Sequence, residues 1–176
     1  GGVELQPLQT FSGFPGHAGG DELGIAVTGV GDFDGGGTDD FAVVARFGDR
    51  PSRRELEDAG YRVDPACPAA GAPNVGAAYI FRGAGSGAPS ERPAFVIYGP
   101  DPRDGLETAA GGFDFDGDGR SDLALGSPRW DREGAFDAGG VAIVLGRPLV
   151  GLGETNVVCA REVELRGRGA RDALGA

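Results

Sequence analysis

Four carboxylates lie at positions 1, 3, 5 and 9 of one short segment, Asp114-Phe115-Asp116-Gly117-Asp118-Gly119-Arg120-Ser121-Asp122. Its glycines permit a tightly curled backbone, and the apolar run Leu123-Ala124-Leu125 follows at once. A related segment, Asp32-Phe33-Asp34-Gly35-Gly36-Gly37-Thr38-Asp39-Asp40, leads into Phe41-Ala42-Val43-Val44. The chain therefore repeats an acidic loop that runs into a short apolar strand.

The residues around the two acidic loops also recur in the same order. Upstream, Asp21-Glu22-Leu23-Gly24 matches Asp104-Gly105-Leu106-Glu107, and Asp172-Ala173-Leu174-Gly175 begins the pattern again. Downstream, Gly76–Phe81 matches Gly140–Leu145. Self-similarity with a fixed order of parts indicates a repeat architecture.

Each repeat contains four short apolar runs separated by Gly-rich turns, which predicts antiparallel strands. In the first repeat the expected strands are Ile25–Gly31, Asp40–Phe47, Gly76–Phe81 and Phe95–Tyr98. In the second they are Thr108–Phe113, Asp122–Gly126, Gly140–Leu145 and Glu162–Leu165. Repeated four-stranded units are typical of β-propeller blades, so the expected fold class is all-β.

We expect residues 1–176 to form a single β-propeller segment of about two four-stranded antiparallel blades plus partial ends. The first blade spans about residues 21–100 with a long insert at 46–75, and the second about residues 104–167. Residues 168–176 begin the next repeat, and Leu8–Phe11 is the expected last strand of a preceding blade. Because two blades leave open edges, we expect the natural protein to be longer.

The second acidic loop has the donor set of a Ca²⁺ site. Asp114, Asp116, Asp118 and Asp122 offer carboxylates, and Arg120 offers its main-chain carbonyl while its side chain is expected to point away. Hard oxygen ligands in this number suit Ca²⁺ at about 2.3–2.6 Å. The loop is not an EF-hand, because position 12 is an apolar residue and strands, not helices, flank it.

The first acidic loop is less complete. Asp32, Asp34 and Asp40 repeat the carboxylates of positions 1, 3 and 9, and Thr38 offers its carbonyl, but Gly36 stands where the second loop has an acid. A water could replace the missing ligand, so we expect a weaker Ca²⁺ site or a loop that has become only a turn. For both loops the alternative is a simple Gly/Asp hairpin turn.

The net charge narrows the classes of partner. The formal charge is −11, from 27 acidic and 16 basic residues, and every basic residue is Arg. Nucleic acid is excluded as an expected partner because the phosphate backbone requires a basic surface. No apolar run approaches the roughly 20 residues that span a membrane, and no signal peptide is visible.

No catalytic constellation is visible in the sequence. His17 is the one histidine and lies in a Gly-rich stretch, and no nucleophile has a recognisable elbow or triad. A pair of acids that cleaves a glycosidic bond is an open alternative, but Ca²⁺ ligation explains the clustered acids better. We therefore expect a binding module and not an enzyme. Trp130 is a candidate for an exposed aromatic contact, with packing against the next blade as the alternative.

The repeats resemble the FG-GAP repeat, the unit of the integrin α-subunit β-propeller. Leu23-Gly24 and Leu106-Glu107 stand at the Phe-Gly position of that family, and Gly126-Ser127-Pro128 stands at its Gly-Ala-Pro position. The resemblance covers about Asp21–Leu165. It implies a propeller with Ca²⁺ on the hairpin loops of one face, in a secreted or cell-surface protein. The Gly- and Ala-rich composition favours a bacterial secreted relative over an animal integrin.

The resemblance sets the order of three functional hypotheses. The first is a Ca²⁺-binding module for extracellular protein or glycan binding and adhesion, in which the ion is structural. The second is the accessory propeller of a larger secreted enzyme, such as a lipase or lyase. The third is a purely structural surface repeat with no partner of its own.

The two cysteines, Cys67 and Cys159, match no zinc motif. They form either a disulfide, in an oxidising compartment, or two free thiols. In a four-stranded blade Cys67 follows a second strand and Cys159 a third, so they start on opposite faces. This placement argues against a direct bond unless the long insert wraps round the edge of the blade.

Overall fold

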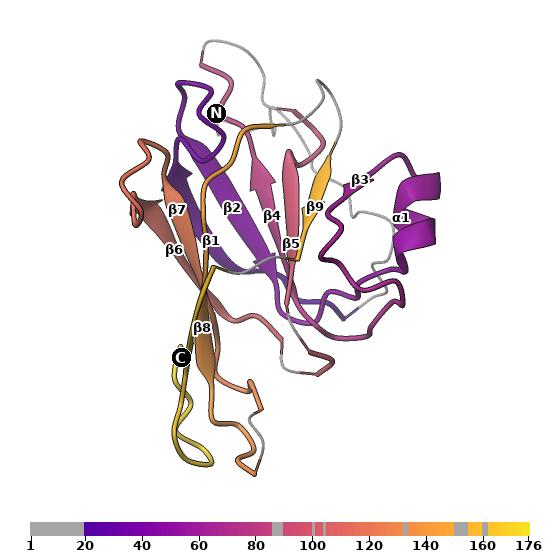
Figure 1. The fold of residues 1–176 in the computed structure, drawn as a ribbon, viewed down its shortest axis with the longest axis vertical. Helices are drawn as coiled ribbons and strands as arrows, with labels where there is room; N and C mark the ends of the chain where they lie inside the picture. Colours follow the sequence, from indigo (N-terminus) through magenta and orange to yellow (C-terminus); the bar gives the residue numbers. More distant parts are fainter. Residues whose placement is uncertain are drawn as a thin grey trace, which may run out of the picture.

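The structure is a computed structural model that describes residues 20–85, 90–99, 101–103, 105–131, 134–149, 155–159 and 162–176. The expected strand Leu8–Phe11 and the residue His17 lie outside these ranges. The described residues form a short helix and two β-sheets whose strands pair mostly antiparallel (Figure 1). The all-β fold class predicted from the sequence is confirmed.

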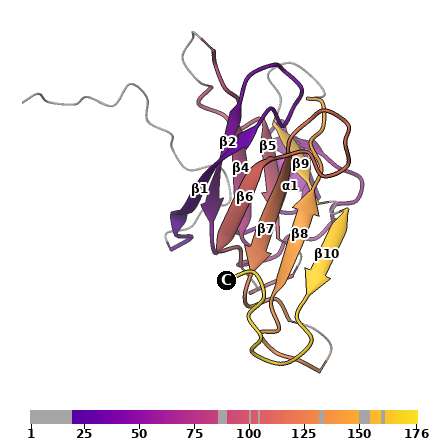
Figure 2. The same cartoon turned by 90° about the vertical axis from the view of Figure 1, so that its left-hand side faces the viewer.

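The second repeat forms a four-stranded sheet with the strand order β10-β8-β7-β6. Every neighbouring pair in this sheet is antiparallel, as expected of a propeller blade. Figure 2 shows this sheet in front, with its strands side by side. Its strands are β6 (Thr108–Phe113), β7 (Asp122–Ser127), β8 (Gly140–Val144) and β10 (Val163–Arg166).

The first repeat forms a six-stranded sheet with the order β1-β2-β4-β5-β9-β3. The strands expected from the sequence are β1 (Leu23–Gly31), β2 (Asp40–Ala45), β4 (Ala77–Phe81) and β5 (Phe95–Tyr98). Two further strands, β9 (Asn156–Val158) and β3 (Arg62–Val63), extend the sheet by parallel pairing. The expectation of only four antiparallel strands is therefore wrong for this sheet.

Strand β9 joins the two repeats. It comes from the connection between β8 and β10 of the second sheet, but it pairs with β5 of the first, with Val157 opposite Val96. The open edge of β5 would otherwise present unpaired N–H and C=O groups. Val157 and Val158 are buried on opposite faces of the sheet, so the added strand also extends both apolar layers.

The insert after β2 packs onto the face of the first sheet that points away from the second sheet. Helix α1 (Arg53–Asp58) begins at Ser52, whose side chain and that of Glu55 form a capping box. The helix buries Leu56 against Tyr79 and its neighbours. The insert thus covers an apolar face of its own sheet.

A disulfide joins Cys67 of the insert to Cys159, which follows β9. The sequence argues against this bond unless the long insert wraps round the edge of the blade, and the structure shows that exception at the outer edge of the first sheet. The insert wraps round this edge through β3, which pairs with β9. The bond closes over a sequence separation of 92 residues.

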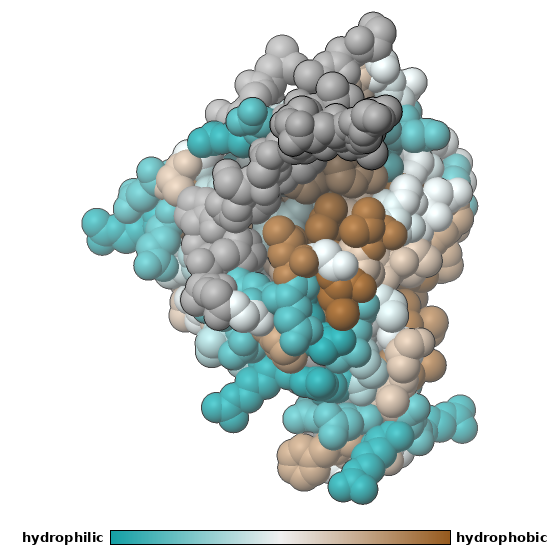
Figure 3. All heavy atoms as spheres, turned by 180° about the vertical axis from the view of Figure 1, so that it is seen from behind, coloured by the Kyte–Doolittle hydropathy of each residue, from teal (hydrophilic) through white to brown (hydrophobic). Residues whose placement is uncertain are grey.

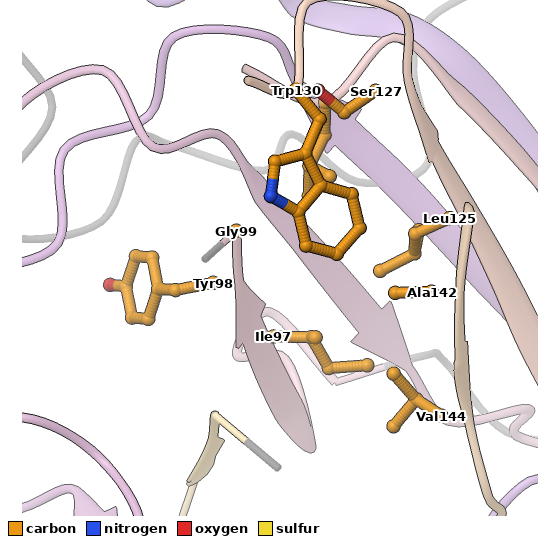
Figure 4. Close-up of a pocket in the computed structure, with 9 residues that line it drawn as sticks. Ile97, Tyr98, Gly99, Leu125, Ser127, Trp130, Ala142 and Val144 are labelled. Atoms are coloured by element: carbon orange, nitrogen blue, oxygen red, sulfur yellow. The ribbon is translucent and has the colours of Figure 1, made fainter. Parts of the chain in front are cut away.

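An apolar core fills the space between the two sheets. Strand side chains alternate, so Ile80 and Ile97 of the first sheet meet Leu125 and Val144 of the second. Figure 4 shows Ile97 and Val144 pointing toward each other below Trp130. The space left among them is a cavity of about 10 Å³, roughly one water in size, so the sheets are well packed.

Trp130 is buried at this junction, so the hypothesis of an exposed aromatic contact is wrong. Its ring lies beside Ser127 and above Leu125 and Ala142 (Figure 4). The guanidinium of Arg166 lies 4.6 Å from the centroid of the indole ring. Trp130 therefore serves the packing of the second sheet.

Residues at matching positions of the repeats differ in burial. Leu106 is 3% exposed in the core between the sheets, whereas the matching Leu174 is 40% exposed. Phe33 is fully buried and packs on Phe95, whereas the matching Phe115 is 54% exposed. Leu106 and Phe33 are buried because both lie in the core between the two sheets, whereas Leu174 and Phe115 lie outside that core.

The opposite outer face is also apolar. Figure 3 shows a brown patch over β1 and β2 on the side of the first sheet that points away from the second. Leu23, Ile25 and Val27 of β1 are exposed large apolar residues. Both outer faces of the pair of sheets therefore carry exposed apolar side chains.

Leu106→Ala should destabilise the chain far more than Leu174→Ala. The first change empties a fully packed site and should lower the free energy of unfolding by about 2–5 kcal/mol. The second removes a half-exposed side chain at the matching position and should cost less than about 1 kcal/mol. Urea unfolding followed by Trp130 fluorescence measures both, and equal losses would contradict the packing described.

Breaking the disulfide should lower the free energy of unfolding by about 2–5 kcal/mol, because the bond closes a long loop in the unfolded chain. Urea unfolding of the oxidised protein, the reduced protein and Cys67→Ser measures this difference. The reduced protein and Cys67→Ser should behave alike under reducing conditions. An oxidised protein no more stable than the reduced one would contradict the role of the bond.

Candidate calcium site

The two acidic loops lie next to each other at one end of the sheets (Figure 2). The first connects β1 to β2 and the second connects β6 to β7. The N–H of Ser121, in the second loop, donates to the carbonyl of Asp32, in the first, at 3.0 Å. The N–H of Arg147 donates to the carbonyl of Phe33 at 2.9 Å. The second repeat is therefore hydrogen-bonded directly to the first loop.

The second loop curls around Asp114. The carboxylate of this residue accepts hydrogen bonds from the N–H groups of Gly117, Asp118 and Gly119 at 2.7, 3.1 and 2.9 Å. Gly117 and Gly119 have φ values of 80° and 90°, in the left-handed region that favours glycine. The spacing of the glycines thus allows the tight backbone turn around which the carboxylates of the loop are arranged.

Three of the predicted carboxylates come together in the second loop. Ligand oxygens of Asp114, Asp116 and Asp122 all lie within 4.8 Å of one another. Asp122 is buried, and it accepts hydrogen bonds from the N–H groups of Phe115 and Gly146 at 2.5 and 2.8 Å. Asp114 and Asp116 are exposed, so the group is open to solvent on one side.

Asp118 is not part of this group. It forms an ion pair with the guanidinium of Arg120, and Arg120 Nε also donates to the carbonyl of Gly146 at 3.2 Å. The Arg120 side chain thus pairs with an acid outside the converging group. That Asp118 and the Arg120 carbonyl ligate an ion stays a prediction.

The first loop brings together the matching carboxylates. Ligand oxygens of Asp32, Asp34 and Asp40 lie within 4.8 Å of one another. The N–H of Gly83 donates to Asp40 at 2.9 Å, and the Thr38 hydroxyl donates to the carbonyl of Gly83 at 3.1 Å. Ligation by the Thr38 carbonyl stays a prediction.

Arg82 lies against the first loop, and the sequence does not predict it there. It directly follows β4, and its Nε lies 2.5 Å from Asp34 Oδ2. The Asp34 side chain is 2% exposed, so this ion pair closes the inner side of the loop. The register of β2 against β4 explains this position, because Phe81 lies opposite Phe41 and the next residue therefore lies beside the loop.

The two loops shift the pKa of their acids in opposite directions. Burial raises the pKa of Asp40 to about 6, and the nearby Asp34 carboxylate contributes to the rise. The N–H groups of Gly119 and its neighbours hold the pKa of Asp114 below its usual range. The carboxylate of Asp114 therefore keeps its charge to low pH, which favours a cation there.

The second loop fits Ca²⁺ on its donor chemistry. Two oxygens bound to one Ca²⁺ at about 2.3–2.6 Å lie up to about 5 Å apart, which matches the spread of the three carboxylates. The open side leaves room for waters, which Ca²⁺ also takes as ligands. When bound, the ion would neutralise the gathered carboxylates of Asp114, Asp116 and Asp122.

In the described part of the chain, no helix has the length and apolar character needed to cross a membrane. A search of curated proteins found no match. Comparison with protein families matches residues 106–144, from Leu106 at the start of the second repeat to the end of β8, to the FG-GAP repeat. The second acidic loop lies in the middle of this match. Residues 106–144 of the chain therefore match the FG-GAP repeat, the repeat unit of the integrin α-subunit β-propeller.

Proposed function

We propose that the chain is a segment of a Ca²⁺-stabilised β-propeller that binds a protein or glycan outside the cell. The observation that carries this proposal is the convergence of Asp114, Asp116 and Asp122 within the matched FG-GAP repeat. Carboxylates gathered this closely repel one another, and a divalent cation between them removes the repulsion. The role of the ion is structural, since it fixes the hairpin between β6 and β7.

The two sheets serve as neighbouring blades in this proposal. The apolar core between them and the exposed apolar residues on both outer faces support it. Leu174 and Phe115 on one side, and Val27 on the other, stand where further blades would cover them. A patch of this kind on a protein surface marks a contact with another apolar surface.

The extracellular setting is supported by the disulfide between Cys67 and Cys159, since such bonds persist in oxidising compartments. The acidic surface, with a formal charge of −11, suits a protein that works where Ca²⁺ is abundant. We propose a binding role and no catalysis, because ligation of a cation accounts for the converging acids of the second loop.

Ca²⁺ should stabilise the chain, and Asp116→Ala should abolish the effect. An extracellular site with a dissociation constant of about 10⁻⁴ M gains about 2.7 kcal/mol at about 10 mM Ca²⁺. This gain raises the melting temperature by about 5–10 °C. Thermal melts with Ca²⁺, with Mg²⁺ and with chelator measure it, and Mg²⁺ should have a much smaller effect.

Asp39→Ala is the matched control for this experiment, because it removes an exposed acid from an acidic loop without touching a converging carboxylate. This variant should keep the full response to Ca²⁺. A cooperative melt whose temperature does not change with Ca²⁺ would contradict the proposed role of the second loop. An equal rise of the melting temperature in Asp116→Ala would contradict it as well.

A further inference from the structure

The backbones of the two acidic loops are closely matched. Gly35 and Gly37 have φ values of 74° and 83°, beside 80° and 90° for Gly117 and Gly119. The N–H of Gly37 donates to Asp32 at 2.9 Å, as the N–H of Gly119 does to Asp114. A difference in cation binding between the loops must therefore come from side chains.

Two side chains distinguish the loops. At position 5 the first loop has Gly36 and the second has Asp118. After the third strand of each repeat, just before the glycine that donates to Asp40 or Asp122, the first repeat has Arg82 and the second has Leu145. The first loop thus loses an acid and gains a cation at neighbouring places.

Arg82 fills the space that the missing acid leaves. A Cβ placed on Gly36 would lie 2.6 Å from Arg82 Nη2 and 2.6 Å from Asp34 Oδ1. Arg82 Nε lies 2.5 Å from Asp34 Oδ2, which belongs to the converging group of the first loop. We infer that Arg82 serves as a built-in cation in the place of Ca²⁺, so that the first loop is held without a metal ion.

Arg120 does not play the same part in the second loop. It pairs with Asp118, whose side chain is 30% exposed and lies outside the converging carboxylates. A partly exposed ion pair of this kind contributes little to stability, so Asp118 and Arg120 hold each other only weakly. Arg82 pairs with Asp34, which is 2% exposed, and its withdrawal would leave a buried carboxylate without its partner. The converging group of the second loop thus stays open to an ion.

The inference extends the proposed function, since it rests on Ca²⁺ as the cation of the second loop. A guanidinium in the first loop makes that loop independent of the Ca²⁺ concentration outside the cell. The converging carboxylates of each loop then face one source of positive charge, which comes from Arg82 in the first repeat and from an ion in solution in the second.

The test is a Ca²⁺ titration of the whole chain followed by amide NMR, with Gly37 and Gly119 as matched reporters. In the native sequence the Gly119 resonance should shift saturably with Ca²⁺, and the Gly37 resonance should not. The double variant Gly36→Asp/Arg82→Leu copies the second repeat at both positions. In it Gly37 should gain a saturable shift, with an apparent affinity about tenfold or more above that of the native loop.

Asp116→Ala supplies a test that does not depend on the double variant folding. In this variant Arg82 is intact, and any shift passed on to Gly37 from the second loop is removed. A flat Gly37 titration supports the inference, and a saturable shift overturns it. Arg54→Leu, which removes an arginine from the surface of α1, is the control for lost positive charge and should leave Gly37 flat.

The outcomes separate this inference from the proposed function. If the Gly119 resonance does not shift in the native chain while the Gly37 resonance shifts in the double variant, the role of Arg82 is supported and the Ca²⁺ site of the second loop is contradicted. If Gly119 responds and Gly37 stays flat in the folded double variant, the Ca²⁺ site stands and the role of Arg82 is overturned.

Discussion

Repulsion between carboxylates is the constraint on which the structure depends. Each repeat places three acids within 4.8 Å of one another at the tip of its first hairpin. Main-chain N–H groups share part of this charge, and in the second loop they converge on Asp114. Nearby positive charge must balance the rest, because like charges at such distances destabilise a compact loop. Arg82 provides this charge in the first loop, and the second loop has the donors to take it from an ion.

The second repeat is attached to the first by hydrogen bonds and by strand pairing. Ser121 and Arg147 donate to main-chain carbonyls of the first loop, and β9 pairs with β5 at the outer edge of the first sheet. At that edge the disulfide between Cys67 and Cys159 links the insert covalently to the segment after β9. A first loop held by its own arginine offers the second repeat a fixed surface at any Ca²⁺ concentration. The order within the second loop then depends on the ion, while the packing of the two sheets does not.

The sequence was sufficient to predict the parts that repeat. Alternating apolar runs and Gly-rich turns placed the paired strands of both sheets, and the spacing of Asp114, Asp116 and Asp122 placed a converging group. It was not sufficient where contacts join segments far apart in the chain. The short run at β9 carries no signal that it will leave its own repeat for β5. The disulfide followed from that crossing, so rules for a four-stranded blade pointed away from it. The position of Arg82 required the register of β2 against β4, which no local pattern gives.

A crystal structure of the chain grown with Ca²⁺, with anomalous diffraction to locate the ion, tests the account most directly. It should show a single strong peak in the two loops, between Asp114, Asp116 and Asp122, with Arg82 still against Asp34. A peak in the first loop with Arg82 swung away, or no peak in a well-ordered second loop, would contradict the account.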